Sequence, residues 1–136
     1  MHIVILEYAK EFFGMKKGEM IVCPGEVVAV SPGAWITRKA LKHLIESRIT
    51  QKNSWEDICY LLDKVEEVIR EPRLTMKNPN QVHYPGSLLL ANFYEGKKLA
   101  VAVILEGGSP GYIITAYFIK KTAFKKLLGK KNGEIE

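Results

Sequence analysis

Apolar residues recur at helical spacing in two segments of the first half of the chain. At about 100° per residue, one arc of residues 36–49 collects Ile36, Ala40, Leu41, Leu44 and Ile45, and charged residues fill the opposite arc. A second segment repeats the pattern from Asn53-Ser54, where either side chain can cap the first turn, as far as Pro72, which ends a helix. The first half therefore predicts two amphipathic helices.

The second half shows the pattern of strands. Runs rich in β-branched and aromatic residues occupy 73–77, 87–94, 99–105 and 112–119, and residues 95–98 are typical of a hairpin turn. A short basic helix, 122–128, closes the chain. This order predicts an α+β fold in which N-terminal helices pack on a four-stranded antiparallel β-meander.

The N-terminal region is harder to interpret. Residues 2–14 fit a helix and a buried strand equally well, and residues 20–23 and 26–30 indicate two short strands around Pro24-Gly25. No repeat or low-complexity linker divides the 136 residues. We expect a single domain over 1–136 with its core at about 28–121.

The composition is that of a globular protein, with 47% hydrophobic and 26% charged residues. Cys23 and Cys59 form no close pair, so we expect buried thiols and neither a metal site nor a cofactor. No run reaches the roughly 18 apolar residues of a membrane span, and the first ten residues lack a basic leader. These features predict a cytoplasmic protein.

The net charge of +5 favours an anionic partner, of which nucleic acid is the common case. Much of the excess lies near the C-terminus, in Lys120, Lys121, Lys125, Lys126, Lys130 and Lys131. A phosphate-binding patch and a solvated tail are equally good interpretations of this cluster.

Four residues in the two halves could carry chemistry. His43 lies at the border of the apolar arc of the first helix, and Arg48 lies inside it, where a guanidinium is costly unless it meets acceptors or water. Strand alternation places Thr115 and Tyr117 on one face, together with Ile113 and Ile119. The structural alternatives are a helix-end arginine that caps carbonyl groups, a surface histidine, and ordinary strand formers.

The order of these features resembles a known group of nucleases. A helix carries His43-x4-Arg48, Pro72 follows a second helix, and residues 111–118 end a meander. Over about residues 28–121 this order resembles the phage-associated nucleases of the Barnase–EndoU–colicin–RelE superfamily. The resemblance implies metal-independent RNA cleavage by a toxin or mobile-element effector, with His43, Arg48, Thr115 and Tyr117 as its catalytic residues.

Metal-free RNA cleavage explains why these residue types are useful. The ribose 2′-hydroxyl attacks the phosphorus, so one group must take its proton, another must protonate the leaving oxygen, and cations must stabilise the phosphorane. A histidine can exchange the proton, an arginine can hold the phosphate with two bonds, and hydroxyls can donate to it. The second acid–base group is not evident, with His83 and Lys98 as the candidates.

The expected substrate contacts are Lys98, Lys120, Lys121 and His83. The expected partners are RNA and, as a further candidate, a cognate protein inhibitor. The competing hypothesis is a non-catalytic module of the same fold that binds nucleic acid or protein through its basic surface. If the nuclease hypothesis is right, the helix residues and the last-strand residues must converge in space.

Overall fold

The computed structural model describes residues 27–31, 34–82, 85–106 and 111–135, which form a six-stranded sheet and three helices. The elements are β1 (Val27–Ser31), β2 (Ala34–Thr37), α2 (Arg38–Thr50), α3 (Trp55–Arg70), β3 (Leu74–Lys77), β4 (Ser87–Tyr94), β5 (Leu99–Glu106), β6 (Gly111–Lys120) and α4 (Lys121–Ile135). This arrangement confirms the α+β class. None of the described helices is long and apolar enough to cross a membrane.

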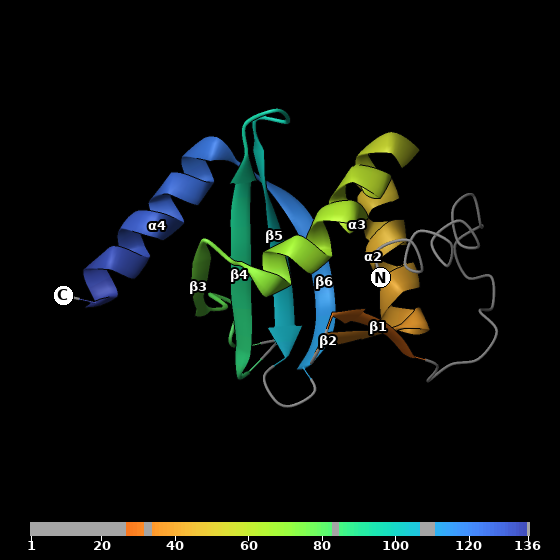
Figure 1. Ribbon diagram of the computed structural model, residues 1–136, viewed down its shortest axis with the longest axis horizontal. Coiled ribbons are helices and arrows are strands. Elements are labelled where there is room, and N and C mark those ends of the chain that lie inside the picture. The colour runs from red at the N-terminus through yellow and green to blue at the C-terminus, as the bar shows by residue number, and fades with distance from the viewer. Residues whose placement is uncertain (1–26, 32–33, 83–84, 107–110, 136) are drawn as a thin grey trace.

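The strand order is β1-β2-β6-β5-β4-β3. Neighbouring strands from β3 to β6 are antiparallel, β1 pairs with β2 antiparallel, and β2 runs parallel to β6. The expectation of a four-stranded antiparallel sheet is therefore too small, because β1 and β2 extend the sheet beyond β6 and make it mixed. Figure 1 shows α2 and α3 together on one side of the strands and α4 apart from them.

Side-chain caps set where the two first helices begin. The Thr37 hydroxyl accepts a 3.0 Å bond from the Ala40 amide, so α2 starts at Arg38, two residues later than predicted, and Ile36 belongs to β2. In α3 the side chain of Ser54 and that of Asp57 each accept from the other residue's amide, which is a capping box. The predicted helix after Asn53-Ser54 is therefore present and begins where its cap requires.

The sheet carries an apolar cluster on each face. The first cluster joins buried residues of α2 and α3, such as Leu44 and Leu61, to Val101 and Val103 of β5. The second cluster contains Leu74, Met76, Leu89 and other strand residues with Phe124 of α4. Burial on both faces makes β5 an apolar run without alternation, as expected of an internal strand covered twice.

A β-bulge changes the face predicted for one residue of β6. The register shifts between Ile104 and Leu105, since Ile104 pairs with Thr115 and Leu105 with Ile113. Ile114 is the extra residue, and Ile113 consequently packs in the first cluster. Thr115 lies opposite Ile104 and so faces the second cluster, as Tyr117 and Ile119 do. The prediction that all four alternate residues share one face is therefore wrong for Ile113.

The C-terminal helix is longer than the predicted 122–128, because α4 spans Lys121–Ile135. β1 matches the strand expected over 26–30 within one residue at each end. The elements expected at residues 2–14 and 20–23 lie outside the described residues, and so does Cys23.

Candidate functional site

The site is built at the edge of β6 that faces α2. β2 pairs with β6 only at Gly111 and Tyr112, and the chain then leaves the sheet as α2. Beyond Tyr112, no strand of the described chain lies on that side of β6. α2 instead contacts β6, and the side chain of Arg48, in its last turns, reaches the strand.

Arg48 is the residue of α2 that meets this edge. Only 6% of it is exposed, and its Nη1 donates a 2.5 Å hydrogen bond to the Ala116 carbonyl, 68 residues further along the chain. Its Nε–H has no hydrogen-bond partner in the described part of the chain. A buried guanidinium with an unpaired donor is energetically unfavourable, and this N–H is itself covered, so an anion reaches it only when the atoms over it move aside.

Tyr117 lies next to the guanidinium. The carbon atom at the centre of the Arg48 guanidinium is 5.8 Å from the Tyr117 ring centroid. Burial raises the pKa of Tyr117, and the charge of Arg48 opposes that rise. Burial lowers the pKa of Arg48, because it destabilises the charged guanidinium. The phenol of Tyr117 and the guanidinium of Arg48 both act as hydrogen-bond donors.

His43 shares a surface pocket with Arg48. The pocket, about 470 Å³ in volume, follows the last two turns of α2 and is lined by residues that include His43, Ser47 and Arg48. The His43 side chain is exposed. The structure thus brings His43 and Arg48 to one pocket and Tyr117 to Arg48.

The prediction that all four residues converge in one cleft is wrong for Thr115, which lies apart from the other three. It faces the second cluster, on the side of the sheet opposite to the apolar packing of α2. Tyr117 faces that side too, yet it reaches Arg48 around the open edge of β6. The site is therefore an edge site, whose residues approach from both faces of the sheet.

The lysines expected to contact substrate gather at one end of the sheet. Leu99 of β5 pairs with Lys120 of β6. Lys98 precedes Leu99 and Lys121 follows Lys120, so the three lysines belong to the same end of this strand pair. Lys98, Lys120 and Lys121 are all exposed. In Figure 1 the β4–β5 hairpin, the end of β6 and the start of α4 lie together at this end. His83 lies outside the described residues.

Two polar residues have roles that the sequence did not indicate. Asn92 accepts a 2.5 Å bond from the Arg73 amide and donates a 3.1 Å bond to the Glu71 carbonyl, so it fastens the α3–β3 connection to β4. Lys97, in the β4–β5 turn, forms a 2.5 Å ion pair with Asp57 of α3. These partners are 19 to 40 residues apart, and no local pattern reports such pairings.

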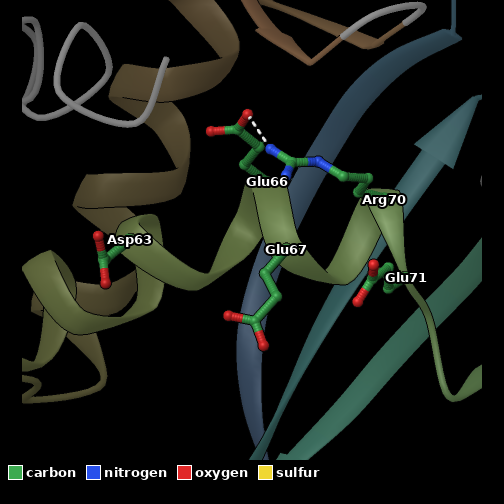
Figure 2. Close-up of a pocket in the computed structure, with 5 residues that line it drawn as sticks. All are labelled: Asp63, Glu66, Glu67, Arg70 and Glu71. Carbon is green, nitrogen blue, oxygen red and sulfur yellow. Dashed lines mark hydrogen bonds and ion pairs between the residues drawn. The ribbon is translucent and has the colours of Figure 1, made fainter.

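The outer surface of α3 is acidic. Asp63, Glu66, Glu67, Arg70 and Glu71 line a pocket of about 310 Å³, in which Arg70 pairs with Glu66 at 2.6 Å. Figure 2 shows that these carboxylates spread along the helix and point in different directions. Among the described residues no three or more His, Cys, Asp or Glu side chains are grouped to hold a metal ion. A surface of this charge repels phosphate.

Comparisons of the chain with protein-family models, with curated proteins and with solved structures found no match.

Proposed function

We propose that the protein is a small metal-independent ribonuclease that cleaves RNA by attack of the ribose 2′-hydroxyl. The observation that carries the proposal is Arg48, which is buried, holds a free Nε–H, and lies beside Tyr117 and on the same pocket as His43. A buried arginine with an unpaired donor fits a phosphate, and the exposed lysines at the end of β6, four residues beyond Ala116, fit the flanking phosphates.

In this mechanism each residue has a distinct task. Once the atoms that cover it move aside, the Nε–H of Arg48 donates, together with the Tyr117 hydroxyl, to the phosphate oxygens that gain charge as the phosphorane forms. His43, the imidazole at the pocket, takes the proton of the 2′-hydroxyl as that oxygen bonds to phosphorus, and water in the open pocket gives a proton to the leaving 5′-oxygen as its bond to phosphorus breaks. Thr115, which faces the opposite side of the sheet, is left with at most a supporting role.

The second candidate is a module that binds RNA without cutting it. Two observations favour it: Thr115 faces away from the packing of α2, and Nη1 of Arg48 already serves the Ala116 carbonyl. The lysines at the end of β6 and on α4 would then hold RNA by electrostatic attraction alone.

One assay separates the two candidates. Generic RNA is incubated with the protein in millimolar EDTA, with His43→Ala and with Lys39→Ala as its control, since Lys39 is an exposed residue one turn earlier on the same side of α2. We expect cleavage to survive EDTA, to fall about 10²–10⁴-fold in His43→Ala, and to persist in Lys39→Ala. Binding without cleavage by the wild type would establish the module, and activity that requires added metal would refute the mechanism.

A further inference from the structure

α4 is attached to the sheet by one apolar side. Phe124, 3% exposed, stacks on Phe93 of β4 with ring centroids 6.0 Å apart, and Leu127 and Leu128 are half-buried against the second cluster. At about 100° per residue these three side chains occupy a single arc of the helix. The rest of its circumference is turned away from the sheet, and Figure 1 shows α4 projecting beyond it.

Between residues 121 and 130 the outward side of α4 carries positive charge and little else. Lys125, Lys126 and Lys130 are exposed, and no ion pair joins them to an acidic residue in the described part of the chain. The other residues on this side are small, namely Thr122, Ala123 and Gly129. Small neighbours let a large polyanion approach the ammonium groups closely.

We propose that α4 binds the backbone of a double-stranded RNA segment, so that the substrate of the enzyme contains a stem. The inference rests on the proposed function for the identity of the nucleic acid. Its own support is the absence of any aromatic side chain on the outward side of α4 between residues 121 and 130. Proteins that hold single strands stack bases on aromatic rings, whereas double-stranded RNA is recognised through its shape, phosphates and 2′-hydroxyls.

The density of charge agrees with a duplex. From Lys121 to Lys130 the helix rises about 13 Å, at about 1.5 Å per residue. A duplex with one phosphate per about 1.7 Å presents about eight phosphates over that length, and one of its strands presents about half as many. The lysines of this helix therefore meet more charge on a stem than on an unpaired strand.

The position of α4 in the chain gives the stem a path to the site. α4 starts directly after β6, so Lys120 and Lys121 lie between the Arg48–Tyr117 pair and the lysines of the helix. The scissile phosphate then lies at the edge of β6, and the stem extends from there along α4.

The test measures binding to two probes that lack a free 2′-hydroxyl and so cannot be cleaved. They are a 2′-O-methyl RNA hairpin and an unpaired 2′-O-methyl strand of the same base composition. The variant Lys125→Gln/Lys126→Gln is compared with the wild type and with Lys39→Gln/Arg70→Gln, which removes the same charge from α2 and α3. Unfolding temperatures confirm that all three proteins are folded.

For the hairpin we expect the salt slope of the α4 variant to fall by about 1.8, or 0.9 for each lost phosphate contact. Raising the salt from 50 to 200 mM then weakens the wild type about 12-fold more than the variant. The control keeps the wild-type slope, and the α4 variant loses less affinity for the unpaired strand than for the hairpin.

An α4 variant that binds the hairpin as the control does, or that loses equal affinity for both probes, overturns the inference. Such a result together with intact RNA cleavage removes only the role of α4. Hairpin binding that depends on α4 but comes without cleavage removes the nuclease and leaves the stem-binding surface.

Discussion

Replacing Arg48 by lysine separates the two uses of its guanidinium. A lysine keeps the charge and can still donate to the Ala116 carbonyl, but it lacks the Nε–H and the planar fork. We therefore expect Arg48→Lys to fold normally and to lose RNA cleavage.

The magnitudes follow from the bonds in the structure. The loss of one donor to a transition-state oxygen typically lowers kcat about 10²–10³-fold, and we expect a loss in this range for Arg48→Lys. Its free energy of unfolding should change by less than about 1 kcal/mol, because the lysine ammonium replaces Nη1 as the donor to the Ala116 carbonyl.

Arg48→Met is the matched comparison, since it preserves the buried stem but leaves the Ala116 carbonyl without a donor. An unsatisfied buried carbonyl costs about 1–3 kcal/mol, which lowers the unfolding temperature of a domain of this size by roughly 3–10 °C. The assays are single-turnover cleavage of RNA and thermal unfolding of both variants. Normal cleavage by Arg48→Lys, with destabilisation in Arg48→Met, would assign Arg48 to closing the strand edge and would refute its role as a phosphate ligand.

Three further predictions concern stability. Burial raises the pKa of Tyr94 to about 12, whereas the phenol of the unfolded chain ionises near pH 10. Between these two pH values only the unfolded phenol ionises, so the folded protein loses stability as the pH rises from about 10 to about 12. The Tyr94 hydroxyl has no hydrogen-bond partner among the described residues, so Tyr94→Phe should unfold at a temperature at or above that of the wild type at neutral pH, and the difference should grow above pH 10. An unfolding temperature that does not diverge above pH 10 would contradict the burial of this hydroxyl. Asn92→Ala should lower the free energy of unfolding by about 1–3 kcal/mol in urea titrations, because two backbone groups lose their partner, and a neutral result would show that water replaces it. Ser54→Ala should cost about 1 kcal/mol through the lost cap of α3, with Ser54→Asp expected to restore most of it.

Local patterns predicted most of the elements. The helical spacing around Leu44 and the cap at Ser54 specified two helices, and both are present, because apolar periodicity and capping depend on residues within a few positions of one another. The predicted helix began two residues too early, at Ile36. This residue is buried as predicted, but it belongs to strand β2. Burial alone cannot separate these states at an element boundary.

The sheet was harder to predict because its edges and its bulge are set by distant residues. The parallel pairing of β2 with β6 places Ala34 beside Gly111, and no local sequence pattern near either residue predicts this pairing. The bulge at Ile114 places Ile113 on the opposite face from the predicted one, whereas Thr115 and Tyr117 share one face as expected. For the site, the sequence could single out Arg48 as an unusual residue on an apolar arc, but not its partner, the Ala116 carbonyl.

The edge of β6 links folding and binding through one side chain. A strand that loses its neighbour exposes backbone groups, and Arg48 satisfies one of them at the cost of burying its own charge. That cost is only partly offset by one hydrogen bond and the neighbouring Tyr117 ring, because Nε–H stays unpaired among the described residues. An anion at the pocket would supply the missing acceptor and the missing opposite charge together. A phosphate ligand should therefore raise the unfolding temperature of the wild type and leave that of Arg48→Met unchanged, which directly connects the strain at this edge to the ligand that relieves it.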